Sequence, residues 1–124
     1  MKASEHSEQC RVINWAWIYQ ERCAALAMLH AIPNAGKRSI GAGRWLVEEG
    51  MKSGVPDLDL PVPMGKFYGL VIEMKFDRNK TSENQDWWLE RYAHYGRKAV
   101  VCYSSDEAIK VICEYLNLPL ADYT

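Results

Sequence analysis

The sequence predicts an α/β fold in which a mixed β-sheet is flanked by α-helices. Its 124 residues, 48% apolar with a formal net charge of −1, suit one globular domain spanning residues 1–124. Two strand-like runs joined by a short turn indicate an antiparallel hairpin. A later strand–helix–strand step indicates a right-handed parallel crossover, so the sheet is expected to be mixed.

The chain alternates predicted helices and strands along its whole length. In order, the sequence predicts a helix at 4–19, a short strand or extended segment at 26–32, a loop at 33–38, a helix from Ser39 to Gly50, strands at 57–62 and 67–76, a helix at 82–95, a strand at 98–103 and a helix from 104 to Asn117.

Three of the predicted helices carry recognisable start signals. Hydroxyl and acidic residues open the first helix, and an apolar stripe follows from Glu8 along one helical face. Ser82 with Gln85, and Ser104 with Glu107, match the capping-box pattern at the starts of the last two helices. These local signals define where the helices begin without reference to the rest of the fold.

Apolar runs and prolines define the strands. Residues 68–74 are almost continuously apolar, as expected for a central strand covered on both faces. Residues 63–66 form a turn, and Pro61 and Pro63 place the end of the preceding strand at a sheet edge or past its last ladder bond. Residues 98–103 are expected to add another buried strand.

Composition narrows the class of protein. The net charge provides no general basic field, so a site for a polyanion must be a local cluster. The sequence has no apolar run of membrane-spanning length and no signal-peptide pattern after Met1, so we expect a cytoplasmic protein with no membrane association. The four cysteines lie in apolar runs without C-x-x-C spacing and are expected to be buried free thiols: Cys10, Cys23, Cys102 and Cys113.

A charged pair at the end of the apolar strand is the candidate site. Glu73 and Lys75 point to the same side because side chains alternate along a strand, whereas Met74 points into the packing. If the hairpin register brings Asp57 opposite, two carboxylates converge beside one ammonium. Such oxygen ligands suit Mg²⁺, which lowers the pKa of a bound water and offsets charge on phosphorus oxygens. The pattern therefore predicts a phosphodiester hydrolase.

Other interpretations of these residues stay open at this point. The charged strand pair could be a solvated surface pair, and Glu8 could simply favour a helix N-terminus through the dipole. Gln85 could serve only as a helix cap. Asp59 shares a strand face with Asp57 and is the rival ligand. Gly54, just before the Pro-Asp pair, lets the backbone approach a neighbour closely.

Two blocks, Gly-Val-Pro-Asp at 54–57 and Ile-Glu-Met-Lys at 72–75, are together quite specific when Gln85 follows them. With these blocks the sequence resembles the virus-type replication–repair nuclease (VRR-NUC) domain family, a branch of the PD-(D/E)xK phosphodiesterase superfamily. The chain departs from the usual family pattern at Ala35, which stands before Gly36 where the family has a second glycine after Pro-Asn. Further matching residues run over nearly the whole chain: Glu8-Gln9, Ile32-Pro33-Asn34, Gly36, Arg38, Gly50, Lys52 and Ser82.

The resemblance implies a restriction-endonuclease-like α/β fold with Mg²⁺ as cofactor, for which Mn²⁺ could substitute, and no nucleotide cofactor. Family members of this size look like phage or prophage proteins that cut branched DNA as homodimers, in the manner of Holliday-junction resolvases, inside bacterial or phage-infected cells. The implied metal ligands are Asp57, Glu73 and the Met74 carbonyl. Lys75 is the implied catalytic lysine, and Glu8 and Gln85 are implied to support the site.

Recognition of DNA is expected to rest on phosphates and shape, because the chain has no zinc-finger spacing and no appended basic helix. For Arg78 and Lys80, a solvated loop is favoured over a contact with DNA phosphates. Symmetric cutting needs two sites, hence a homodimer, and one of the adjacent Trp87 and Trp88 is expected to face a partner subunit. The candidate nucleic-acid contacts are the polar and basic residues of two turns: Asn34, Lys37, Arg38 and Lys52.

The expected function is a metal-dependent, structure-selective DNA endonuclease. Two alternatives stay open: an exonuclease or restriction-type duplex nuclease on the same core, and a DNA-binding module without chemistry.

Overall fold

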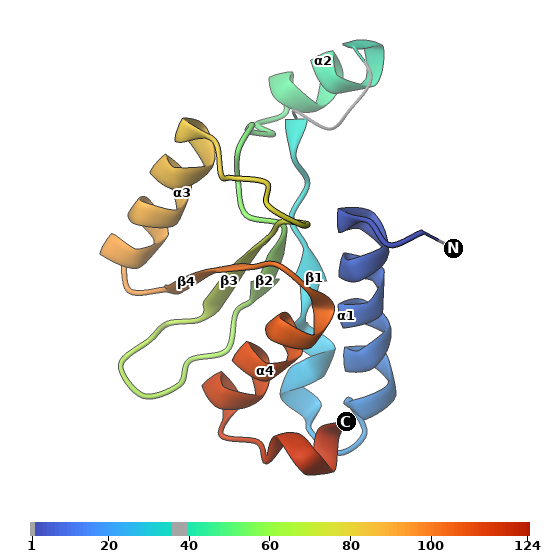
Figure 1. The fold of residues 1–124 in the computed structure, drawn as a ribbon. Coiled ribbons are helices and arrows are strands. Elements are labelled where there is room, and N and C mark those ends of the chain that lie inside the picture. Colours follow the sequence, from blue (N-terminus) through green and yellow to red (C-terminus); the bar gives the residue numbers. More distant parts are fainter. Residues whose placement is uncertain (1, 36–39) are drawn as a thin grey trace.

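The computed structural model describes residues 2–35 and 40–124, with side chains at 40–43 left out. Figure 1 shows a sheet with α1 and α4 on one side, α3 on the other and α2 projecting beyond one end. The elements are α1 (Glu5–Tyr19), the 3₁₀ helix η1 (Ala24–Met28), β1 (His30–Ala31), α2 (Ile40–Glu48), β2 (Leu58–Leu60), β3 (Leu70–Met74), α3 (Glu83–His94), β4 (Lys98–Cys102), α4 (Ser105–Leu116) and the 3₁₀ helix η3 (Leu120–Tyr123).

The described strands form one mixed sheet in the order β1-β2-β3-β4. The β1–β2 and β2–β3 pairs are antiparallel and the β3–β4 pair is parallel, as the hairpin and the crossover predicted. In the hairpin Leu58 pairs with Ile72, so Asp57, the residue before β2, lies next to the end of the ladder that Glu73 continues. This register is the one that the candidate site requires.

One face of the sheet forms the hydrophobic core. All five residues of β3 are buried, which confirms its prediction as a central strand. Because side chains alternate along a strand, Met74 lies in the core while Glu73 points to the opposite face. The buried residues that the strands, α1 and α4 contribute to this core are Leu58, Leu60, Leu70, Ile72, Met74, Cys102, Val12, Trp15, Ala16, Ala108, Ile109, Ile112, Cys113, Tyr115 and Leu116.

The predicted caps are present, with one difference. Ser82 and Gln85 form the complete capping box of α3. Ser104 accepts a hydrogen bond from the Glu107 N–H of α4 at 3.1 Å, but the Glu107 carboxylate accepts from Tyr103 N–H at 3.2 Å instead of completing the box. The Glu107 carboxylate thus pairs with the backbone N–H of Tyr103 and not with that of Ser104.

Several predicted boundaries are wrong. Residues 26–28 belong to η1, and only two residues of the expected segment 26–32 pair as β1. The strands of the hairpin are shorter than predicted, because β2 ends at Leu60 before Pro61. β4 is half-buried over four of its five residues, since it is an edge strand of the described sheet. The proposed cap at Ser39 lies outside the described residues.

The prediction of four buried thiols holds for two cysteines. Cys102 and Cys113 are buried, Cys23 is half-buried and Cys10 is exposed on α1. Burial, with the Glu107 carboxylate nearby, raises the pKa of the Cys102 thiol from 9.0 to about 12. No described helix has the length and apolarity needed to cross a membrane.

We expect a maleimide to modify Cys10 rapidly in the folded protein at neutral pH, because this thiol is exposed. Cys102 should react only after unfolding, since burial hides the thiol and its raised pKa keeps it protonated. Peptide mapping by mass spectrometry, before and after denaturation, measures both. Rapid labelling of Cys102 in folded protein would contradict the packing described here.

Candidate functional site

Three carboxylates converge at the end of the sheet where β3 finishes. Glu5 begins α1, Asp57 immediately precedes β2 and Glu73 lies in β3; one carboxylate oxygen from each lies within 4.8 Å of the others. Asp57 is 4% exposed and Glu73 is fully buried. Two oxygen ligands at about 2.0–2.6 Å from one cation lie at most about 4–5 Å apart. The spacing and the hard oxygen donors therefore fit a divalent cation.

The backbone of β3 joins this cluster through Asp57. The Met74 N–H donates to Asp57 Oδ2 at 2.8 Å, whereas the Lys75 N–H donates to the Cys102 carbonyl of β4 at 2.8 Å. Backbone groups of successive strand residues point to opposite sides, and the N–H and C=O of one residue point to the same side. The Met74 carbonyl is thus directed to the side of the strand on which Asp57 lies.

Asn34 supports the loop that carries Asp57. Its side chain is 8% exposed, donates to the Val55 carbonyl at 3.2 Å and accepts from the Gly54 N–H at 3.4 Å. In the structure this amide joins the segment after β1 to the loop before Asp57. The nucleic-acid contact expected at Asn34 stays a prediction.

The same loop is held from α3. Asn84 Nδ2 and Trp88 Nε1 both donate to the Ser53 carbonyl, at 2.7 and 3.1 Å. Gly54 has a φ of 87°, and a Cβ there would lie 2.7 Å from Asn84 Nδ2. The close approach expected at Gly54 is therefore made to α3, and it needs a residue without a side chain.

Glu8 does not belong to the acidic cluster. Its carboxylate is buried against α4, where Oε1 accepts from the Ser105 N–H at 3.0 Å and Oε2 lies 3.5 Å from Arg11. A carboxylate at a helix N-terminus satisfies an unpaired N–H and interacts favourably with the helix dipole. The structure thus assigns to Glu8 the joining of α1 to α4, and brings Glu5, one turn earlier, to the site.

Lys75 follows β3 directly and is half-buried. Alternation places its side chain on the same face as Glu73, as predicted. Gln85 begins α3, where its Oε1 accepts from the Ser82 N–H at 2.9 Å; the interpretation of Gln85 as a cap is confirmed.

Asp59, the rival ligand, is engaged elsewhere. It forms an ion pair with Arg97, and its Oδ2 lies 3.8 Å from His30 Nε2. Of the predicted nucleic-acid contacts, Lys52 is exposed, whereas Lys37 and Arg38 lie outside the described residues.

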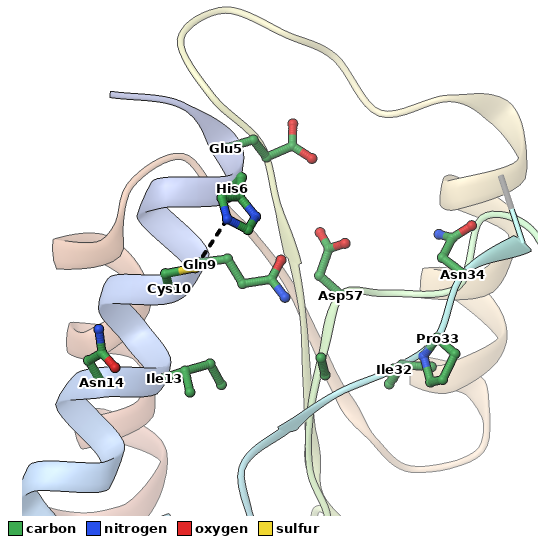
Figure 2. Close-up of a pocket in the computed structure, with 11 residues that line it drawn as sticks. Glu5, His6, Gln9, Cys10, Ile13, Asn14, Ile32, Pro33, Asn34 and Asp57 are labelled. Atoms are coloured by element: carbon green, nitrogen blue, oxygen red, sulfur yellow. Dashed lines mark hydrogen bonds between the residues drawn. The ribbon is translucent and has the colours of Figure 1, made fainter. Parts of the chain in front are cut away.

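A pocket of about 810 Å³ opens beside the acidic cluster. Figure 2 shows Glu5 and Gln9 pointing from α1 toward Asp57, with Ile13 one turn further on and Ile32 across the gap. The pocket is lined by Glu5, His6, Gln9, Cys10, Ile13, Asn14, Ala31, Ile32, Pro33, Asn34 and Asp57.

Replacing Glu5 by Gln should weaken metal binding about 10- to 100-fold, the usual effect of altering groups around a metal site. The matched change Glu8→Gln, one turn further along α1, should leave metal affinity nearly unchanged and lower stability through its contact with Ser105. Calorimetric titration with Mg²⁺ or Mn²⁺ and thermal melts of both variants measure the two effects. The assignment fails if Glu8→Gln weakens the metal site more than Glu5→Gln.

A mixed sheet with helices on both sides and an acidic cluster at the end of its central strand defines a nuclease-like α/β fold. The chain belongs to the VRR-NUC domain family, a nuclease family, whose model matches residues 1–106. It is similar to a solved structure described as "VRR_NUC domain protein", with a TM-score of 0.79 and 27% identity over 95% of this chain and 92% of that chain. No curated protein matches it significantly.

Glu5 could not be recognised as a candidate site residue from the sequence. It follows the cap Ser4 in the first turn of α1, a position where acids commonly stabilise the helix dipole. Nothing in the local sequence separates that role from metal binding. Only the packing of α1 against the sheet distinguishes Glu5 from Glu8.

Proposed function

We propose that this protein is a metal-dependent DNA endonuclease that cuts branched DNA in the manner of a Holliday-junction resolvase and acts as a homodimer. The observation that carries the proposal is the acidic cluster, in which one carboxylate oxygen each of Glu5, Asp57 and Glu73, from three separate parts of the chain, lies within 4.8 Å of the others. Membership of a nuclease family makes phosphodiester hydrolysis the chemistry that such a cluster serves.

Asp57 and Glu73 would hold Mg²⁺, with the Met74 carbonyl as a further ligand and Glu5 at the same centre. When bound, the metal supplies a more acidic water and stabilises negative charge on the phosphate oxygens. The Asp57 carboxylate is held by the Met74 N–H, which keeps it oriented toward the cluster. Burial of Glu73 excludes bulk water from one side of the site and strengthens electrostatic interactions there.

Lys75 would provide a positive charge beside the metal site. Its side chain lies on the Glu73 face, and a half-buried ammonium can donate to the attacking water or to a phosphate oxygen. Either contact stabilises the negative charge that develops at phosphorus. This is the role that the family resemblance implies for Lys75.

A second region suits contact with DNA or a partner subunit. Lys52 and Trp87 both line a hollow of about 800 Å³ between the 52–53 segment and α3. Trp87 is 49% exposed, whereas the adjacent Trp88 is tied to the Ser53 carbonyl. Of the two tryptophans, Trp87 is therefore the one that we assign to a partner subunit.

The described residues of one chain contain one such acidic cluster. Symmetric cutting of two strands then requires two copies, and a two-fold dimer matches the symmetry of a four-way junction.

The test is a cleavage panel: four-way junction, flap and perfect duplex DNA with Mg²⁺ or Mn²⁺, using protein whose mass in solution is measured. We expect metal-dependent cuts at the branch of the junction by a dimer. Release of single nucleotides, or preferred cutting of duplex, would favour the exonuclease or restriction-type alternative. Binding without cleavage at any metal concentration would leave only the DNA-binding module.

Replacing Lys52 by Ala should weaken binding to all DNAs similarly and lower the slope of log affinity against log salt by about one, the effect of losing one phosphate contact. Lys110→Ala is the matched control, because Lys110 is exposed on α4, on the other side of the sheet. Fluorescence anisotropy over a salt series measures both slopes. Equal slopes in the two variants would refute a phosphate contact at Lys52.

A further inference from the structure

The pocket beside the acidic cluster changes its chemistry along its length. In Figure 2, Glu5, Gln9 and Ile13 project toward the gap from successive turns of α1. Eight residues of helix span about 12 Å. The pocket thus runs from a carboxylate end, through an amide, to an apolar end lined by Ile13 from α1 and by Ile32 and Pro33 across the gap.

The order of chemical groups along the pocket matches the order of groups in one nucleotide. A phosphate belongs at the metal end, with Glu5 and Asp57. A base presents hydrogen-bonding groups on its edge, which the Gln9 amide can meet, and flat apolar faces, which suit the aliphatic walls. The volume of about 810 Å³ lies in the usual range of small-molecule pockets.

A stacked base in a duplex cannot enter such a pocket. It must first leave the helix, which requires breaking its stacking and pairing, and that cost is least for a base already unpaired. Branch points, bulges and flaps contain bases of this kind. A pocket that must be filled before cleavage would therefore select branched over regular DNA without reading its sequence.

We propose that this pocket receives an unstacked nucleobase adjacent to the scissile phosphate, and that this requirement is the source of selectivity for branched DNA. The inference rests on the proposed nuclease function and specifies its substrate. The base lies between Ile13 and Ile32, with its edge toward Gln9 and its phosphate at the acidic cluster.

The test places 2-aminopurine as the unpaired base of a single-nucleotide bulge in an otherwise regular duplex. Its emission is quenched by stacking, and the described residues that line the pocket include no tryptophan or tyrosine. Binding in the presence of Ca²⁺ should raise the emission several-fold. A probe placed within the paired arm should not respond. With Mg²⁺, the bulged duplex should be cut about 10- to 100-fold faster than the perfect duplex.

Ile13→Trp fills the apolar end and should abolish both the emission change and the preference for the bulge, with metal affinity unchanged. Ile18→Trp is the matched control, since Ile18 is 67% exposed on the same helix. Ile13 also packs against the core, so a second block is needed. Alkylation of the exposed Cys10, which lines the pocket, with a bulky maleimide should have the same effect, and treated Cys10→Ser protein should match its untreated sample.

The outcomes separate the two proposals. Metal-dependent cleavage without any emission change, or equal behaviour of Ile13→Trp and Ile18→Trp, overturns the base pocket and leaves the nuclease intact. Loss of emission change on blocking the pocket supports it. If no DNA is cut and no metal binds, the proposed function fails. The emission titration then still tests the base pocket. A saturable rise in emission with wild type, absent with Ile13→Trp and with alkylated protein, requires a base bound in the pocket.

Discussion

Asp57→Asn is expected to lower the rate of DNA cleavage by about 10²- to 10³-fold, the effect of removing one preorganised electrostatic group from a catalytic site. The amide oxygen can still accept from the Met74 N–H, which Asp57 does at 2.8 Å, so the fold should persist. The charge that would bind the metal is lost. Single-turnover cleavage, calorimetric metal titration and a thermal melt measure the three consequences.

Asp59→Asn is the matched control, two residues further along the chain. Asp59 is held by Arg97 and His30, so its replacement should reduce stability and leave metal affinity and cleavage within a few-fold of wild type. Cleavage undiminished in Asp57→Asn, or abolished equally in both variants, would contradict the placement of the metal centre.

Ile72→Ala should lower the free energy of unfolding by about 2–5 kcal/mol, the usual cost of a large-to-small change in a well-packed core. Ile72 is 1% exposed and lies in β3, paired with β2 on one side and β4 on the other. The cavity cannot close easily because both neighbouring strands constrain the backbone. Urea denaturation followed by circular dichroism gives the midpoint and slope.

Val47→Ala provides the comparison, because Val47 is 53% exposed on α2 and its truncation should change stability by no more than about 0.5 kcal/mol. Similar losses in the two variants would be inconsistent with a core formed on the α1 and α4 face of the sheet.

Much of the architecture could be predicted from local signals. The capping box of Ser82 and Gln85 marks the start of α3 and is present as predicted. The apolar run at 68–74 identifies the central strand, although Tyr68 proves exposed just before it. Strand ends and the extended segment before residue 33 were less predictable, because two-residue pairing such as β1 depends on a neighbour distant in the sequence.

The candidate site divides in the same way. Asp57, Glu73 and Lys75 could be recognised because strand alternation and the hairpin register place them together, and both are short-range properties. Glu5 and Glu8 could not be told apart by sequence. They lie one turn apart on α1, and packing against α4 directs Glu8 to Ser105 while Glu5 reaches the sheet.

The sequence by itself therefore predicted the α/β class, the hairpin, and two carboxylates of the candidate site, since periodicity and turns act over a few residues, whereas the register of the hairpin is given by the structure. Only the tertiary structure decided which acid of α1 completes the cluster, that Asn34 supports the Asp57 loop, and that a pocket adjoins the cluster. These features arise where distant segments meet, and their geometry depends on the rigid packing of helices on the sheet, which no local pattern encodes.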